Sequence, residues 1–260
     1  MLHLSIITIC FNNLEDVKKT CTSVDSQSLK PYEHIIIDGS TNTDIKTFLE
    51  NTPQPVYRNW ICERDKGIAD AFNKGIKNAT GDIIYLLNSG DTIYDETVTQ
   101  RVIDVFEKDP TIMWSNGKLK TFRGNLWVIV GKPFEKKKLY RGMRSVFHPT
   151  MYVRKEVYDR CGAFDISIKY AMDYDFLCRI RDEKNVFIDY LLAIFDPTGI
   201  STTQYLTAME DAYRCYRKYY GYSFKQTLWS WRLSFLHHLL NSPIGKSLYR
   251  LKVKLGLQNV

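Results

Sequence analysis

The sequence predicts an α/β fold with a mostly parallel central sheet flanked by helices, followed by a helical C-terminal extension. In about the first 90 residues, short β-branched apolar runs alternate four times with helical runs, and this alternation is typical of parallel sheets with right-handed crossovers. The apolar runs also lack a polar residue at every second position, as expected for strands covered on both faces.

The strands expected in the first half are short, and each leads through a turn to a helix. The clearest helix spans 68–79, where apolar or small residues recur at the spacing of one helical face. Pro53 and Pro55 end the helix before it. The expected strands are 4–10, 33–38, 56–62 and a run beginning at Ile83, and the expected helices are 14–27, 44–50 and 68–79.

Beyond residue 95 the pattern changes to a run of strand-like segments. Asn116-Gly117 and Gly124-Asn125 lie between three of them and are typical of hairpin turns. His148-Pro149 predicts an edge or bulged strand, because proline cannot donate to a ladder. The expected strands are 111–115, 118–122, 126–130, 145–153 and one or two in 186–195; the expected helices are 96–108, 154–161, 172–181 and the region from 203 onward, broken at Gly221 and Pro243.

Charge divides the chain into two parts, which we expect to be residues 1–200 and a basic helical extension, 201–260. The chain has a formal net charge of +7, yet no acidic residue follows Asp211, so the excess positive charge lies in the extension. Aromatic and basic residues on short helices suit an anionic membrane surface, and they equally suit a helical cap packed on the domain. Both interpretations stay open, whereas nucleic acid is not an expected partner because no recognised binding module accompanies the charge.

The composition predicts a cytoplasmic protein, peripheral at most on the inner face of the membrane. The six cysteines are scattered without zinc or redox spacing, which fits a reducing compartment. The sequence has no leader typical of a signal peptide and no uncharged apolar run near the ~20 residues of a membrane helix.

Three acidic residues follow predicted strands of the parallel sheet. Asp38, Asp65 and Asp91 are expected at one edge, where ligands of open α/β sheets bind. Three carboxylates at one edge repel each other, so a divalent cation with a diphosphate is expected among them, and oxygen ligands suit magnesium or manganese. A carboxylate there could also accept the imide N–H of uracil or thymine. In the alternative, each acid only caps a helix.

Four motifs in order carry a family resemblance: Ser5-Ile6-Ile7-Thr8 with Asn12, Ile36 to Thr41, Asp65 to Gly75, and Leu86 to Asp91. They resemble the family-2 glycosyltransferases of the GT-A fold, strongly over about the first 100 residues and more thinly to about residue 195. The resemblance implies that residues 1–200 bind a nucleotide sugar and carry catalysis. It also implies a nucleoside-diphosphate sugar donor, a divalent metal (Mn or Mg) and inversion at the anomeric carbon.

The resemblance also implies roles for single residues. Asp38 matches the acid that pairs with the base ring, which predicts a UDP- or dTDP-sugar, and Asp91 matches the metal-binding acid. Asn88 and Gly90 stand where the family usually has further acids, and Phe72 stands where many members have arginine. The negative charge of the diphosphate is therefore expected to be neutralised by Lys66, Lys74 or the basic segment 132–144. The implied nucleotide-binding residues are Thr8, Asn12, Asp38, Asp65 and Asn73.

His148 and Asp173 are the remaining site candidates. A histidine in the region of His148 often approaches the metal or the donor phosphates in the family, and neutral imidazole can do either. Asp173 opens a predicted helix and matches the family's general base, which must reach the acceptor hydroxyl. Asp175 is the second choice for the base. Alternatively His148 is structural, and both acids only favour the positive end of the helix.

These features predict a metal-dependent inverting glycosyltransferase that transfers a sugar to a hydroxyl of a glycan or lipid-linked acceptor in polysaccharide biosynthesis. The alternative is a non-catalytic nucleotide- or glycan-binding protein on the same fold, because the Asn88-Ser89-Gly90-Asp91 motif has lost acids.

Overall fold

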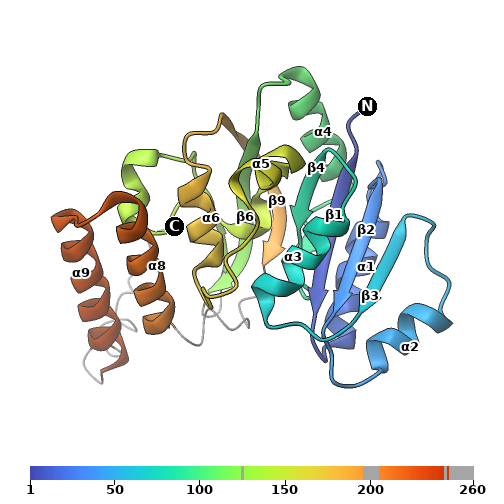
Figure 1. Cartoon of the computed structure of the whole chain (residues 1–260), viewed down its shortest axis with the longest axis horizontal. Helices are drawn as coiled ribbons and strands as arrows, with labels where there is room; N and C mark the ends of the chain where they lie inside the picture. The colour runs from blue at the N-terminus through green and yellow to red at the C-terminus, as the bar shows by residue number, and fades with distance from the viewer. Residues whose placement is uncertain (124–125, 196–204, 243–244, 246–260) are drawn as a thin grey trace.

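A computed structural model of the chain describes residues 1–123, 126–195, 205–242 and 245. These residues form a nine-stranded sheet in the order β3-β2-β1-β4-β8-β6-β9-β5, with β7 paired to β6 (Figure 1). Helices cover both of its faces, and two C-terminal helices stand at the end of the molecule opposite β3.

The parallel half of the sheet is centred on β1 (Leu4–Cys10). It pairs in parallel with β2 (Glu33–Asp38) and with β4 (Ile83–Leu86), and β2 pairs in parallel with β3 (Arg58–Cys62). Every residue of β1, β2 and β4 is buried, which explains why their sequences show no polar alternation. The carboxyl ends of all four strands therefore meet at one edge, as the sequence predicts.

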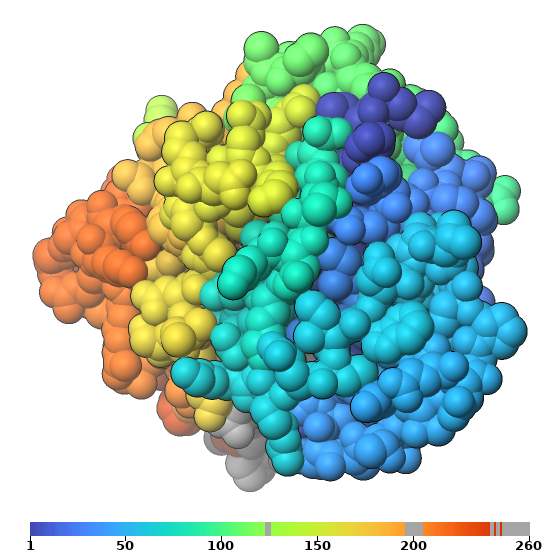
Figure 2. All heavy atoms as spheres, turned by 45° about the vertical axis from the view of Figure 1, so that its right-hand side comes forward, coloured from blue at the N-terminus to red at the C-terminus, as the bar shows by residue number. Residues whose placement is uncertain are grey.

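Two layers of helices enclose this half. The helices α1 (Leu14–Asp25), α2 (Asp44–Asn51) and α4 (Val98–Lys108) pack on one face. On the other face α3 (Ile68–Asn78) packs against β1 and β2. In Figure 2, α3 forms a teal band between the blue N-terminal layer and the yellow residues near 150–180, so it joins the two halves of the molecule.

The second half of the sheet is mixed. The strand β8 (Tyr152–Arg154) pairs antiparallel with β4, and β6 (Trp114–Arg123) pairs antiparallel with β8 and parallel with β9 (Asn185–Phe195). The short β5 (Thr92–Ile93) pairs antiparallel with β9, and β7 (Leu126–Val130) pairs antiparallel with β6. Parallel pairing therefore dominates the first half of the sheet, and the second half supplies the antiparallel strands.

Two local expectations are wrong. Asn116-Gly117 is not a hairpin turn but lies inside β6, where the pairing with β9 shifts register after Gly117. A Cβ on Gly117 would lie 2.5 Å from Leu192 Cδ1, so the glycine serves close packing. The segment around His148 is not a strand either: His148–Thr150 is a 3-10 turn, η2, with Pro149 near its start, and β8 begins only at Tyr152.

The remaining helices extend the layer that contains α3. They are η1 (Lys136–Arg141), α5 (Lys155–Cys161), α6 (Met172–Arg179), α8 (Tyr205–Tyr220) and α9 (Phe224–Asn241). The helix α8 packs on α6, and α9 packs on α8 and η1 (Figure 1). The predicted break at Gly221 is confirmed, with its φ at +70° between α8 and α9.

The predicted break at Pro243, and residues 201–204 and 246–260 of the extension, lie outside the described residues. Among the helices of the described ranges, none combines the length and apolar character needed to span a bilayer.

The tight contact between α3 and β1 gives a stability prediction. A Cβ on Gly75 would lie 2.3 Å from Ile7 Cγ2, so Gly75→Ala must push α3 away from the sheet. Overpacking of this kind costs about 1–3 kcal/mol, which outweighs the roughly 0.5–1 kcal/mol that alanine gains in a helix. Chemical denaturation should therefore show a less stable variant. The exposed Lys77→Ala in the same helix is the control and should change stability by less than about 0.5 kcal/mol; equal stability of the two variants would contradict the close packing.

Candidate active site

Asp38 and Asp65 lie side by side at the carboxyl edge of the parallel strands. Asp38 ends β2, is 4% exposed and accepts a hydrogen bond from Ser40 N at 3.0 Å. A Cβ on Gly39 would lie 1.8 Å from Asp65 Oδ2, so the Asp65 carboxylate rests directly on the backbone after Asp38. The structure therefore brings these two predicted residues together.

Asn12 fixes the loop beside them. It has a φ of +54°, a conformation that asparagine tolerates better than most residues. Its Oδ1 accepts hydrogen bonds from Thr41 N at 2.9 Å and Asn42 N at 3.3 Å, and its own N–H donates to Ser40 Oγ at 2.8 Å. Asn12 thus ties the loop after β1 to the loop after β2, and it positions the edge on which Asp38 lies.

Thr8 is placed differently from its predicted role at the nucleotide. Its side chain is fully buried, and its Oγ1 lies 2.9 Å from His34 Nε2. Arg58 Nε donates to His34 Nδ1 at 3.1 Å, so in the neutral imidazole Nε2 carries the proton and donates to Thr8. Burial and the nearby Arg58 guanidinium hold the pKa of His34 well below its usual range. Thr8 therefore joins β1 to β2 and leaves no exposed surface for a nucleotide.

Asp91 follows β4 and is pinned against α1. It is 2% exposed, its Oδ2 accepts from Asn88 Nδ2 at 3.3 Å, and its carbonyl accepts from Thr20 Oγ1 at 2.8 Å. The Thr20 hydroxyl oxygen also accepts from Gly90 N at 3.0 Å. Asn88, which replaces an acid of the family motif, thus holds the remaining carboxylate.

The three predicted acids follow strands of the same edge, but they do not form one group. Within the described ranges no group of three or more His, Cys, Asp or Glu side chains is arranged to hold a metal ion. Asp38 and Asp65 follow β2 and β3, whereas Asp91 follows β4, on the other side of β1. Any metal held here would therefore take most of its ligands from a bound diphosphate and water, as magnesium commonly does.

Asn73 joins α3 to the segment that leads to α6. Its Nδ2 donates to Phe164 O at 2.8 Å, and its Oδ1 accepts from Phe164 N at 2.8 Å. Both polar atoms of the side chain amide are therefore occupied by one backbone unit. In this structure Asn73 positions a loop, and its predicted contact with a nucleotide stays a prediction.

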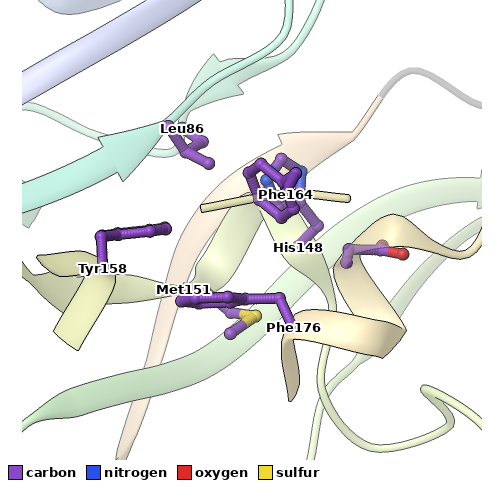
Figure 3. A pocket seen from close by; sticks show the side chains of 7 residues that line it. Leu86, His148, Met151, Tyr158, Phe164 and Phe176 are labelled. Carbon is purple, nitrogen blue, oxygen red and sulfur yellow. The ribbon is translucent and has the colours of Figure 1, made fainter. Parts of the chain in front are cut away.

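His148 and Asp173, which are far apart in sequence, line the same pocket. Figure 3 shows His148 beside Phe164, with the other labelled apolar side chains around them. The closed space between the lining atoms is about 10 Å³, roughly the room for one water molecule, so in this structure the pocket does not admit a sugar. The pocket is lined by His148, Asp173, Leu86, Met151, Tyr158, Phe164 and Phe176.

His148 is neutral at physiological pH. Burial lowers the pKa of its imidazole to about 4, and its ring packs edge-on against Phe72 with centroids 5.3 Å apart. Its buried Nε2 has no hydrogen-bond partner among the described residues. A buried polar atom without a partner is costly, so a ligand or water that bonds Nε2 would be stabilised there.

Asp173 lies in the first turn of α6, partly buried in this pocket. Burial raises the pKa of its carboxyl to about 6, although Tyr174 N donates to Oδ1 at 2.8 Å and favours the charged form. A carboxylate with a pKa near 6 is ionised at neutral pH yet basic enough to accept a proton in a reaction. This combination suits general-base catalysis.

Asp175 has a different environment two residues later. It is 1% exposed and accepts hydrogen bonds from Arg179 Nε at 3.1 Å, Lys218 Nζ at 3.4 Å and Tyr219 Oη at 2.8 Å. The last two belong to α8, so Asp175 anchors α6 to the C-terminal extension. Its carboxylate does not line the pocket of Asp173, which argues against the second-choice role as base.

The extension also holds the segment just before Asp173. Asp211 Oδ2 accepts from Tyr170 N at 3.2 Å, and Cys215 Sγ lies 3.9 Å from Ala171 O. Asp211 and Cys215 both belong to α8. The helix that follows the predicted domain boundary at residue 200 thus fixes the start of α6, and the boundary itself stays a proposal.

Comparison with known proteins identifies the family. The sequence profile described as "Glycosyl transferase family 2" matches residues 5–162. The chain belongs to this family. An uncharacterised glycosyltransferase of Mycobacterium tuberculosis is 30% identical over 208 residues, which cover 76% of this chain and 77% of that protein.

Two solved structures share the fold. S. aureus TarS residues 1–349 with UDP-GlcNAc gives a TM-score of 0.64 at 16% identity, over 93% of this chain and 68% of that one. A mannosyltransferase of Pyrobaculum calidifontis with GDP-Man and Mn²⁺ gives 0.62 at 13% identity, over 99% and 81%. This chain spans only 44% of a longer TarS chain. The predicted GT-A-like fold is thereby confirmed for this family 2 glycosyltransferase.

The apolar lining of the pocket was not predicted from the sequence. Leu86, Met151, Tyr158 and Phe164 come from four separate segments, and each taken alone resembles an ordinary core residue. A partial signal existed at Phe164, because it stands just after Gly162 and shortly before the acid-bearing helix.

The two acids of α6 should affect stability in opposite directions. Because the folded protein raises the pKa of Asp173 from 3.8 to about 6, its contribution to stability is fully present below pH 3.8 and is lost as pH rises through 6. Asp173→Asn cannot ionise, so above pH 6 it should be more stable than the parent by roughly 1–3 kcal/mol, and the difference should vanish near pH 4.

Asp175→Asn is the matched control in the same denaturation series. It loses charged hydrogen bonds to Arg179 and Lys218 and should be less stable at neutral pH by about 1.5–3 kcal/mol. A pH-independent or destabilising effect of Asp173→Asn would show that Asp173 is not desolvated as described.

Proposed function

We propose that this family 2 glycosyltransferase transfers a sugar, with inversion, from a UDP- or dTDP-sugar to a hydroxyl of a glycan or lipid-linked acceptor in polysaccharide biosynthesis. The observation that carries the proposal is Asp173, a partly buried carboxylate whose pKa is raised to about 6 in a pocket shared with His148. Donor recognition then falls to the carboxyl edge of the parallel strands, and base catalysis falls to the first turn of α6.

The donor nucleotide is assigned to the edge formed by Asp38 and Asp65. Asp38 ends β2 beside the loop that Asn12 ties down, so a base ring placed there would meet a fixed carboxylate. A carboxylate oxygen accepts the imide N–H of uracil or thymine, and the N1–H and amino group of guanine could donate to it as well. The TarS neighbour, whose structure contains UDP-GlcNAc, supports this choice, while the neighbour with GDP-Man makes the base a point to test.

The side chains present fit a divalent metal that arrives with the diphosphate. Asp91 offers one carboxylate, and the unpartnered Nε2 of neutral His148 offers a nitrogen ligand or a phosphate contact. Such a metal, manganese or magnesium, would neutralise charge on the leaving diphosphate. The Mn²⁺ in the mannosyltransferase neighbour supports this assignment.

Asp173 is assigned as the base that accepts the proton of the acceptor hydroxyl. The acceptor oxygen forms a bond to the anomeric carbon, its proton passes to the Asp173 carboxylate, and the bond from that carbon to the diphosphate breaks, which leaves a nucleoside diphosphate. Attack opposite the leaving group inverts the anomeric carbon. The apolar lining of the pocket keeps water away from the base and so preserves its raised pKa.

One observation favours a second function, a non-catalytic nucleotide- or glycan-binding protein. Asn88 and Gly90 replace acids, and the described ranges hold no three-residue metal group. Hydrolysis of a nucleotide sugar in the presence of manganese separates the two, because a binding protein would leave the donor intact.

Asp173→Asn should lose about 10²–10⁴-fold in transfer rate while its affinity for the donor stays near that of the parent, because a general base acts only in the reaction. Product formation and donor calorimetry measure the two effects. Asp159→Asn makes the same charge change on α5, where its side chain is 63% exposed and pairs with Lys155, and it should keep full activity. Equal loss of donor affinity and rate in Asp173→Asn would assign the residue to binding instead.

Asp91→Ala should abolish the manganese dependence of nucleoside-diphosphate binding, since Asp91 is the acid left in its motif. Thermal shifts of the parent with UDP and manganese should reach about 2.7 kcal/mol of added stability at 100 times the dissociation constant. In the variant the shift should be the same with and without manganese. A variant that still responds to manganese as the parent does would place the metal elsewhere.

A further inference from the structure

The outer face of α9 carries an apolar stripe that no described residue covers. Its residues lie at positions i, i+4, i+7 and i+11, which is one face of a helix. Each is more than half exposed: Phe224 by 70%, Leu228 by 54%, Trp231 by 66% and Phe235 by 54%.

The opposite face of α9 packs against the rest of the protein. Gln226 is buried and donates to Tyr213 O at 3.2 Å, Trp229 packs against Tyr140 of η1, and His237 stacks on Tyr205 with centroids 5.1 Å apart. The stripe is therefore not the face that attaches α9 to α8 and η1. An apolar row that faces outward on a helix already held by its other side indicates a second contact.

Charge around the stripe indicates the chemistry of that contact. Lys225 and Arg232 are exposed and, at helical spacing, lie along one side of the stripe, and α9 contains no acidic residue. The whole sequence after Asp211 contains nine Lys or Arg and no Asp or Glu. Bulky aromatic residues beside basic residues, without acids, suit the interface of a bilayer with anionic headgroups. Two copies of this face would bring like charges together, which disfavours self-association.

We propose that the outer face of α9, defined by Phe224, Leu228, Trp231 and Phe235, docks the protein on an anionic lipid surface. The helix lies in the plane of the interface with these side chains among the acyl chains, while Lys225 and Arg232 contact the headgroups. Figure 1 places α8 between α9 and α6, so a docked protein holds Asp173 of α6 one helix away from the docking helix. The docking itself does not depend on the proposed function. Only its purpose does, because docking would bring the proposed glycosyltransferase close to a lipid-linked acceptor.

Vesicle sedimentation tests the docking face. The parent should sediment with phosphatidylglycerol-containing vesicles and much less with pure phosphatidylcholine vesicles. Trp231→Ser combined with Phe235→Ser should lower the partition coefficient at least about tenfold, because two exposed aromatic side chains no longer enter the bilayer. Lys225→Gln and Arg232→Gln should each weaken binding to anionic vesicles about fivefold.

Trp127→Ser is the matched control. Trp127 is 57% exposed on β7 and has Lys120 over its ring at 5.1 Å, so it is an equally exposed aromatic beside a basic residue. This variant should bind vesicles as the parent does. Thermal unfolding should be unchanged in all of these variants, since every altered side chain is exposed.

Three results would overturn the proposal: no sedimentation of the parent with anionic vesicles, unchanged binding of the Trp231 and Phe235 double variant, or a dimer in light scattering that the double variant abolishes. The last result would assign the face to a second copy of the chain. Hydrolysis of a soluble donor, measured in the same samples, separates this proposal from the proposed function. If docking is lost while hydrolysis is intact, the enzyme assignment still holds. If hydrolysis is lost while docking is intact, the docking face still holds.

Discussion

The position of α6 between two sets of hydrogen bonds is the constraint on which the candidate site depends. On one side Asn73 of α3 holds the backbone of Phe164 through both of its amide atoms. On the other side α8 supplies Asp211, which accepts from Tyr170 N, and Lys218 and Tyr219, which bind Asp175. Between these attachments the first turn of α6 has little freedom, and Asp173 is held in an apolar pocket. A carboxylate would otherwise turn toward water.

The two acids of α6 show how environment separates roles. Asp175 is buried yet paired with cations, so its charge is compensated, whereas Asp173 is desolvated and accepts a hydrogen bond from the backbone N–H of Tyr174. The stability lost by desolvating Asp173 is offset in part by the Asp175 pairs, so α8 helps to stabilise the fold around Asp173.

The strand–helix alternation of the first half was predictable because it depends on local patterns, and the same patterns placed Asp38, Asp65 and Asp91 at one edge. Which of those acids lie together was not predictable, because it depends on how β1 separates the loops that follow β2 and β3 from the loop after β4. The Asn116-Gly117 turn was wrong because a long-range partner, Leu192, decides what that glycine does. Asp173 was predicted from its resemblance to the family's base, but its shared pocket with His148 required tertiary structure, since 25 residues and two further elements separate them.

For the C-terminal helices too, the sequence predicted their presence but not their contacts. From the sequence alone, the C-terminal helices could bind a membrane surface or form a helical cap. In the structure α8 and the inner face of α9 pack on the domain as a cap, and the outer face of α9 is exposed. The general-base assignment depends on the ionisation of Asp173, which can be measured directly. In the folded protein with ¹³C-labelled aspartate, the Asp173 carboxyl resonance, assigned by its absence in Asp173→Asn, should titrate with a pKa of about 6. A midpoint near the ordinary value of 3.8 would show that the pocket does not desolvate this carboxylate, and the general-base assignment would lose its physical basis.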